Sequence, residues 1–235
     1  MITENNDTNT AISRILILAA TEKELKPTLD FVNQDPVLLI QKLTNIGISI
    51  KLSTIGVGGA SAIFNAYELI QQADLVILVG VAGSFQTSIQ LGEVIQVVSD
   101  EFADLGVNDR GVFRSVFEIG LTNANEFPFN NGKIPASTFL NIHDLKTVEG
   151  ITVNTVSGDE VGIAKLIKAY PHANIETMEG AYIHYLAAMF HKKLLHIRGI
   201  SNYVEPRNRA NWKLDEAIVA CNEYIVKVLN NLSLF

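Results

Sequence analysis

Apolar runs rich in β-branched residues recur along the chain, and glycine or polar residues follow each of them. Residues 14–20 and 75–81 are the clearest runs, because neither alternates regularly between apolar and polar positions. This pattern is typical of strands that are buried on both faces of a sheet. Further strands are predicted at residues 93–98, 113–119, 151–156, 175–178 and 194–200.

Segments with helical spacing lie between these strands. Residues 59–72, for example, place Ala62, Ala66 and Ile70 on one side of a helix. Further helices are predicted at residues 137–142, 160–169, 179–190 and 212–230.

One early hairpin interrupts the alternation of strands and helices. Residues 36–43 and 46–55 predict its two strands, and Thr44 and Asn45 its turn. The complete order predicts an α/β fold, a three-layer α/β/α sandwich around a central mixed sheet. No repeat or linker divides the pattern, so we expect a flexible tail over residues 1–13 and a single domain over residues 14–235.

The composition narrows the class of protein. Of the 235 residues, 48% are hydrophobic and only 18% are charged, which excludes a disordered chain and suffices for one sizeable core. The net charge of −7 and the lack of a basic run argue against nucleic acid as a partner. Cys221 is the only cysteine, which fits a reducing compartment. Residues 1–13 lack the features of a signal peptide, and the apolar run at residues 75–83 is too short to span a membrane, so we expect a cytoplasmic protein with no membrane partner.

Polar residues gather directly after the predicted strands, where α/β sheets bind their ligands. Glu24, Glu179 and Asn202 all occupy such positions. Each has an ordinary explanation when taken alone, since Glu24, for example, suits the first turn of a helix. The glycines at residues 56–59 do not complete a dinucleotide fingerprint and no Walker lysine follows, which weighs against a dinucleotide-binding dehydrogenase.

Seven segments in this order resemble the purine nucleoside phosphorylase/nucleosidase superfamily, and most strongly its futalosine hydrolase family. They are residues 18–25, 56–59, 78–85, 97–106, 155–162, 176–187 and 197–209, and they extend over nearly the whole chain. The resemblance implies a nucleoside phosphorylase-like fold and an enzyme without a cofactor. Such an enzyme hydrolyses the N-glycosidic bond of a purine nucleoside, futalosine, to release hypoxanthine in menaquinone biosynthesis. It also implies a homo-oligomer, in which Phe102, Phe113 or Phe117 closes the site of a neighbouring copy.

The resemblance also implies a role for individual residues. Glu24 corresponds to the carboxylate that contacts the attacking water, and Glu179 to the one that binds the ribose hydroxyls. Met178 would pack against the sugar and Arg198 would orient a carboxylate, although a core methionine and a buried salt bridge explain these two residues equally well. Asn202 replaces the aspartate of the adenine-specific nucleosidases, and its amide can donate to a 6-oxo group or to N7 of hypoxanthine.

The remaining candidates line the expected pocket more loosely. The resemblance places backbone of the glycine loops and of the following segments near the substrate, and the carboxylate of futalosine calls for cations and an aromatic wall. These candidates are Gly56, Gly80, Val161, Ser201, Arg207, Arg209 and Trp212. Two loop arginines can equally be solvated.

Three alternatives remain at this point: a methylthioadenosine/S-adenosylhomocysteine nucleosidase, a purine nucleoside phosphorylase, or a catalytically silent nucleoside-binding protein. Leu78 and Val81 stand where the phosphorylases hold phosphate, and neither side chain can bind it, which favours hydrolysis. The five histidines are dispersed and show no metal-binding pattern, so no metal is expected.

Overall fold

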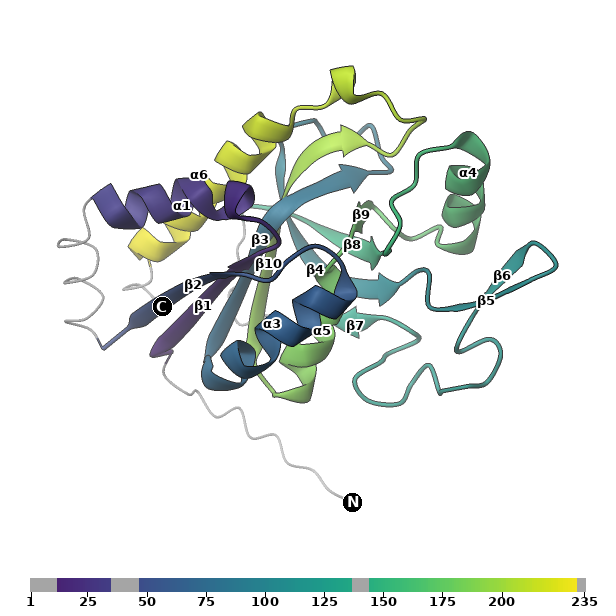
Figure 1. Ribbon diagram of the computed structural model, residues 1–235, viewed down its shortest axis with the longest axis horizontal. Helices are drawn as coiled ribbons and strands as arrows, with labels where there is room; N and C mark the ends of the chain where they lie inside the picture. Colours follow the sequence, from purple (N-terminus) through teal and green to yellow (C-terminus); the bar gives the residue numbers. More distant parts are fainter. Residues whose placement is uncertain (1–11, 35–46, 137–143, 232–235) are drawn as a thin grey trace.

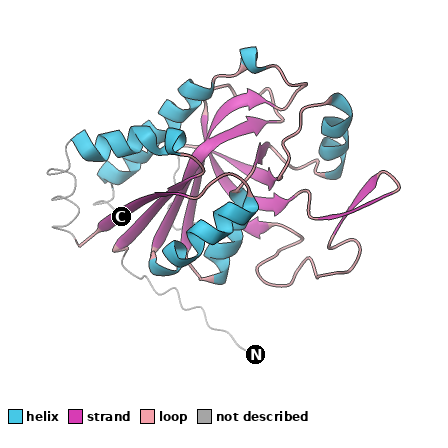
Figure 2. Cartoon of the chain, in the orientation of Figure 1, coloured by secondary structure: helices cyan, strands magenta, loops and turns pink. Residues whose placement is uncertain are grey.

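A computed structural model describes residues 12–34, 47–136 and 144–231 of the chain. Its centre is an eight-stranded mixed sheet, and helices cover both faces of the sheet (Figures 1 and 2). The predicted α/β sandwich with a central mixed sheet is therefore confirmed.

The sheet is built around a long central strand, β3 (Leu75–Ser84). Strand β10 (Lys193–Tyr203) pairs with β3 in parallel along its whole length. Strand β1 (Arg14–Ala19) pairs in parallel only with residues 75–78 of β3, and β9 (Ile175–Thr177) pairs antiparallel only with residues 83–84. The side of β3 that faces away from β10 thus has no strand partner between these two pairings.

The other strands complete the sheet on either side. They are β2 (Ser49–Thr54), which pairs in parallel with β1, β4 (Val94–Phe102), β7 (Ile134–Pro135) and β8 (Lys146–Thr152). A separate two-stranded ribbon consists of β5 (Gly106–Asp109) and β6 (Val112–Ser115).

Two pairs of helices enclose the sheet (Figure 1). On one face α1 (Glu22–Gln34) packs against α6 (Leu214–Asn231), and on the other α3 (Gly59–Gln72) packs against α5 (Gly180–Met189). The remaining helices of the described residues are α4 (Glu160–Ala169), whose start Asp159 caps as expected, and the short η1 (Arg209–Asn211). None of the helices in the described ranges is long and apolar enough to cross a bilayer.

Successive residues of the central strands enter two different cores. Ile17 and Ile77 pack with Cys221 under α1 and α6, whereas Leu18 and Leu78 pack under α3 and α5. This is why the sequence of these strands shows no alternation: both faces are buried.

Several predicted boundaries differ from the structure. The strand predicted at residues 151–156 is β8, which begins at Lys146 and ends at Thr152, and the Asn154 side chain beyond it bonds to Asp104 and Tyr182. The strand predicted at residues 113–119 ends at Ser115, because the Glu118 carboxylate accepts from the Ser115 N–H and starts a turn.

Two other predictions cannot be compared with the structure in full. The first strand and the turn of the early hairpin, and the helix predicted at residues 137–142, lie outside the described residues. The second strand of that hairpin contains β2.

Candidate active site

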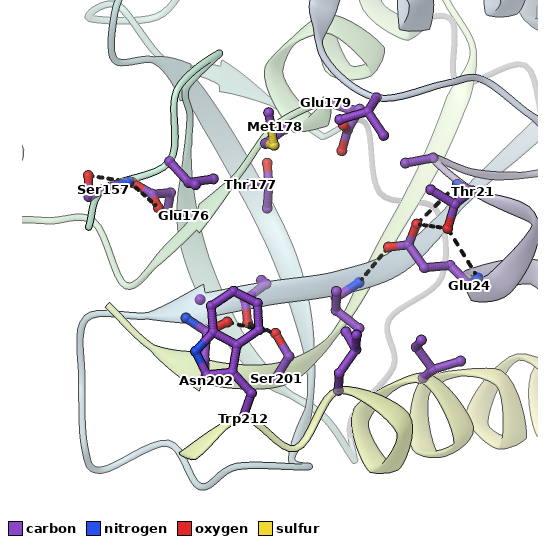
Figure 3. A pocket seen from close by; sticks show the side chains of 18 of the residues that line it. Thr21, Glu24, Ser157, Glu176, Thr177, Met178, Glu179, Ser201, Asn202 and Trp212 are labelled. Carbon is purple, nitrogen blue, oxygen red and sulfur yellow. Dashed lines mark hydrogen bonds between the residues drawn. The ribbon is translucent and has the colours of Figure 1, made fainter. Parts of the chain in front are cut away.

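A cavity of about 360 Å³ lies at the carboxyl ends of β1, β3 and β10 (Figure 3). Seven of the residues predicted from the sequence line it, namely Glu24, Met178, Glu179, Ser201, Asn202, Arg207 and Trp212. They come from three parts of the chain that are far apart in sequence, at residues 24, 178–179 and 201–212, and the sheet brings them together at one edge.

Glu24 lies in the first turn of α1, and both of its carboxylate oxygens are held. Oε2 accepts hydrogen bonds from the backbone N–H of Thr21 at 3.1 Å and from its hydroxyl at 2.8 Å. The N–H of Glu24 donates to Thr21 Oγ1 at 3.3 Å, which completes a reciprocal capping box. Oε1 accepts from the N–H of Val81 at 3.2 Å. Glu24 is thus both a helix-start residue and a fixed carboxylate in the cavity wall.

Glu179 lies between β9 and α5, on the other side of the cavity from Glu24 (Figure 3). Its Oε1 accepts a hydrogen bond from the backbone N–H of Gly58 at 2.9 Å. Burial raises the pKa of this carboxyl group, while the charge of Arg198 and the Gly58 hydrogen bond act to lower it. Gly58 has φ of 81° and begins α3, so a helix N-terminus holds the carboxylate.

The amides of the glycine loop are occupied by the protein itself. The N–H of Gly56 donates to Ala20 O at 3.0 Å, and that of Gly59 donates to Asn154 Oδ1 at 3.3 Å. Together with the bond from Gly58, these contacts show that the loop supports Glu179 and the neighbouring strands. Gly56 does not line the cavity, because its N–H donates toward β1 and Ser61 lies against its α-carbon.

Arg198 lies behind the cavity wall, not in it, with 1% of its surface exposed. A Cβ at Gly80 would stand 2.3 Å from Arg198 Nη1 and 2.7 Å from Glu24 Oε1, so only glycine fits between them. Gly80 therefore separates the two charged groups and does not line the cavity. No ion pair among the described residues includes Arg198, so the alternative of a buried salt bridge is not found there.

Asn202 occupies the opposite end of the cavity from Glu24 (Figure 3). A bulge in β10 interrupts its register between Ile200 and Asn202, and it turns the consecutive side chains of Ser201 and Asn202 toward the same cavity. Asn202 Oδ1 accepts from the Ser201 hydroxyl at 2.8 Å, and Nδ2 donates to Tyr203 O at 2.9 Å. Because an amide NH₂ has two hydrogens, one donor of Asn202 remains for a ligand.

Glu176 is a carboxylate of this end that the sequence analysis did not single out. Gly83 of β3 is in register with Glu176 of β9 on one side and with Asn202 of β10 on the other. Both oxygens of Glu176 accept from Ser157, at 3.1 Å from its N–H and at 2.8 Å from its hydroxyl. Burial raises the pKa of Glu176, and these bonds act to lower it. A charged residue within a three-residue buried strand was the signal that could have revealed it.

Trp212 forms the outer wall of the cavity, and two arginines stack on it. The Arg207 guanidinium carbon lies 5.2 Å from the ring centroid and that of Arg209 lies 5.8 Å from it. Arg207 lines the cavity, but Arg209 lines a neighbouring hollow together with Lys23. The two predicted arginines are therefore not equivalent.

Val161 does not line this cavity. It is 65% exposed in the first turn of α4, after the N-cap residue Asp159. The segment that does reach the cavity is Val156 and Ser157, before the helix. Thr21, Thr177 and Val57 also line the cavity and were not predicted.

Asp100 is fully buried behind the site. Its Oδ1 accepts from Thr152 Oγ1 at 2.8 Å and from the Glu101 N–H at 2.9 Å, whereas Oδ2 has no partner among the described residues. Burial raises the pKa of Asp100 to about 7, against the lowering effect of the Thr152 bond and the Arg198 charge. Asp100 also lies with His184 and His196 in a group whose ligand atoms are within 4.8 Å of one another.

Comparisons with known proteins identify the family of this chain. A family model described as the phosphorylase superfamily matches residues 14–230. A futalosine hydrolase of Streptomyces coelicolor is 29% identical over 158 residues, which are 66% of this chain and 65% of that protein. A futalosine hydrolase of Thermus thermophilus is 25% identical over 178 residues, which are 74% of this chain and 78% of that protein. The chain thus matches just under two thirds of the length of the Streptomyces relative.

The fold is also similar to that of solved nucleosidase structures. A methylthioadenosine/S-adenosylhomocysteine nucleosidase of Colwellia psychrerythraea, in complex with adenine, is similar with a TM-score of 0.70 at 18% identity. The similarity covers 94% of this chain and 96% of the other.

We expect Asp100→Asn to stabilise the protein increasingly as the pH rises from about 4 to about 7. Over this range the folded protein keeps the Asp100 proton and the unfolded chain has lost it, so the wild-type protein loses stability as the pH rises. One pKa unit corresponds to about 1.4 kcal/mol. The Tm difference between variant and wild type should therefore grow by several degrees and then level off above pH 7.

Thermal melts at each pH measure this Tm difference, and Asp109→Asn, at an exposed position, is the control. A Tm difference that does not change with pH contradicts the effect of burial on Asp100.

Proposed function

Because the chain belongs to the phosphorylase superfamily, we propose that it hydrolyses the N-glycosidic bond of a purine nucleoside and that its substrate is futalosine. The observation that carries this proposal is that the two ends of one cavity differ in their chemistry. Two carboxylates, Glu24 and Glu179, flank one end, and the amide of Asn202 lies at the other. The relatives named futalosine hydrolase support the choice of substrate.

The carboxylate end suits the sugar and the attacking water. Cleavage of an N-glycosidic bond gives the bond's electron pair to the departing base and leaves a cation-like ribose, which nearby carboxylates stabilise. Glu24 accepts a proton from the water as the water oxygen bonds to the ribose carbon. The departing base takes up a proton from solvent, so the products are the ribose hydroxyl and the neutral free base. Arg198 faces Glu24 across Gly80 from behind the cavity wall, so its charge helps to orient the carboxylate that holds the water. Glu179 accepts hydrogen bonds from the ribose hydroxyls, and Met178 packs against the sugar.

The amide end suits a 6-oxopurine. The free N–H of Asn202 donates to O6 or N7 of the base. Gly83 lies between Asn202 and Glu176 and has no side chain to obstruct the base. Hypoxanthine carries a hydrogen on N1, which a carboxylate such as Glu176 can accept. Adenine has no hydrogen on N1, so this pair of side chains favours the 6-oxo base.

Water, not phosphate, is the proposed acceptor. Leu78 is fully buried in the core under α3 and α5, and Val81 presents an apolar side chain to the cavity. Neither offers the hydrogen-bond donors that a phosphate dianion requires.

We further propose that the enzyme is a homo-oligomer. Phe64, which is 85% exposed, and Tyr67 lie on one face of α3, and Val57 at the start of that helix also lines the cavity. A second copy that covers this face would reach the open side of the site. Phe102 is not the residue that enters a neighbouring site, because it is buried against Tyr182.

The direct test incubates the protein with futalosine, inosine and methylthioadenosine in phosphate-free buffer and identifies the released base. The proposal predicts hypoxanthine from futalosine at the highest rate. Adenine from methylthioadenosine alone contradicts the substrate, a strict need for phosphate contradicts hydrolysis, and no base from any nucleoside contradicts the reaction.

Glu24→Gln is expected to lower kcat by about 10²- to 10⁴-fold, the usual contribution of a general base. The amide keeps the size of the side chain but cannot accept the proton of the water. Substrate binding, measured by calorimetry, should persist. Glu22→Gln, at an exposed position of the same helix turn, is the control and should retain activity; near-normal turnover by Glu24→Gln removes Glu24 from the mechanism.

Asn202→Asp is expected to move the base preference toward 6-aminopurines. The aspartate loses the N–H that donates to a 6-oxo group, and its added acceptor can pair with a 6-amino group. We expect kcat/KM for futalosine to fall by about 10- to 100-fold, with a smaller loss for an adenine nucleoside. Equal losses for both substrates would show that Asn202 does not read the base.

Arg207→Ala is expected to raise KM for futalosine by about tenfold, the value of one charge-assisted hydrogen bond to its carboxylate. Inosine lacks this carboxylate, so its KM should change little. Arg209→Ala is the matched control, because Arg209 stacks on the same tryptophan but lines the neighbouring hollow. The same KM change in both variants, or in neither, contradicts a specific role for Arg207.

A further inference from the structure

A continuous chain of hydrogen bonds runs behind the cavity wall from Arg198 to the backbone of β7. Arg198 Nε donates to His196 Nε2 at 2.7 Å. His196 Nδ1 lies 2.9 Å from His184 Nε2, and His184 Nδ1 lies 2.9 Å from the carbonyl oxygen of Ile134. All three side chains are buried, with exposures of 1% or less.

The donors and acceptors of this chain are fixed from both ends. Arginine nitrogens only donate, so His196 Nε2 accepts and the ring proton of His196 is on Nδ1. That proton is donated to His184 Nε2, so the proton of His184 is on its own Nδ1 and points to the Ile134 carbonyl. Both imidazoles are neutral, because a further proton on either Nε2 would face another donor. Burial and the Arg198 charge lower the pKa of both rings, that of His184 to about 4.

The same bonds exclude a metal ion at the Asp100, His184 and His196 group. The lone pair of each Nε2 is already occupied by a donor, and each Nδ1 carries a hydrogen. A cation would also lie beside the guanidinium of Arg198. The two histidines of this group are therefore close together because they are hydrogen-bonded to each other and to Arg198.

We propose that His196 and His184 are positioning residues that hold the Arg198 guanidinium opposite Glu24 for the hydrolytic water, a role that rests on the proposed function. The bond from Nε to His196 is the short anchor of the guanidinium. The other contact, from Nη1 to Val81 O, is 3.3 Å long, and Nη2 has no partner among the described residues. Without His196 the guanidinium keeps only the 3.3 Å bond to Val81 O, which does not fix its orientation.

Neutral imidazoles suit this purpose better than carboxylates. A carboxylate in place of His196 would form an ion pair with Arg198 and cancel its charge. An imidazole holds the guanidinium and leaves its full charge to act on the site, where it favours the ionised form of Glu179. The last hydrogen bond of the series, from His184 to the Ile134 carbonyl of β7, fixes the orientation of the guanidinium relative to the sheet.

A pair of amide substitutions at position 196 separates the two bonds of the imidazole. The oxygen of His196→Gln can reach the place of Nε2 and accept from Arg198. The NH₂ of His196→Asn reaches the place of Nδ1 and donates to His184, but leaves Arg198 without an acceptor. We expect His196→Asn to lower kcat for futalosine by about 10- to 100-fold with little change in KM, and His196→Gln to stay near wild type. If His196→Asn and His196→Gln have the same kcat, the positioning role is contradicted. This holds whether both kcat values equal that of the wild type or both fall together with Tm.

Nitrogen-15 NMR of the wild-type histidines tests the chain without any variant or substrate. Two-bond ¹H–¹⁵N spectra at neutral pH should show His184 and His196 as neutral rings with the proton on Nδ1, the rarer tautomer of free histidine. A charged ring, or a proton on Nε2 of His196, contradicts the proposed hydrogen-bond directions. If no nucleoside releases its base, the proposed function fails and the positioning role fails with it, while these tautomers remain a separate test of the hydrogen bonds.

Discussion

The site depends on one constraint of the sheet, the loss of a neighbour along β3. Strand β1 accompanies β3 only to Leu78, and β9 joins only at Gly83, while β10 follows the whole strand. A backbone N–H that is buried without a partner is costly, so the open stretch of β3 must be satisfied in another way. The carboxylate of Glu24 does this by accepting from Val81. The divergence of β1 thus opens the cavity and also fixes a carboxylate at its wall.

Only 18% of the residues are charged, yet three buried glutamates and one buried arginine lie at the site, and none of these four side chains forms an ion pair among the described residues. Glu24, Glu176 and Glu179 are each held by backbone N–H groups or hydroxyls, not by cations. Arg198 is likewise held by an imidazole and a carbonyl oxygen. Neutral partners satisfy the hydrogen-bonding capacity of a buried charge and leave its field directed at the ligand.

The sequence predicted the parts of this structure that follow from local pattern. Ile17 and Leu18 face opposite cores, so the buried strands were evident, and Glu24 and Glu179 were found because they follow such strands. Asn202 was found in the same way, and its role toward the base came from the resemblance to a family. What the pattern did not reveal depends on register: the bulge that turns Ser201 and Asn202 to one side, and the pairing of Glu176 with Gly83. Val161 lies outside the cavity for a related reason, because the sequence shows that a helix begins there but not which of its sides meets the cavity.

The bond from the Gly58 backbone to Glu179 has a consequence for how this protein can vary. Its donor belongs to the main chain, so no particular side chain supplies it, but Gly58 holds a φ of 81°, where a side chain would be strained. The length of the loop is constrained as well. An insertion or deletion between β2 and α3 shifts every amide by one residue and leaves Glu179 without its donor. Among descendants of this sequence, the length of the loop and the glycine at position 58 should therefore be inherited together.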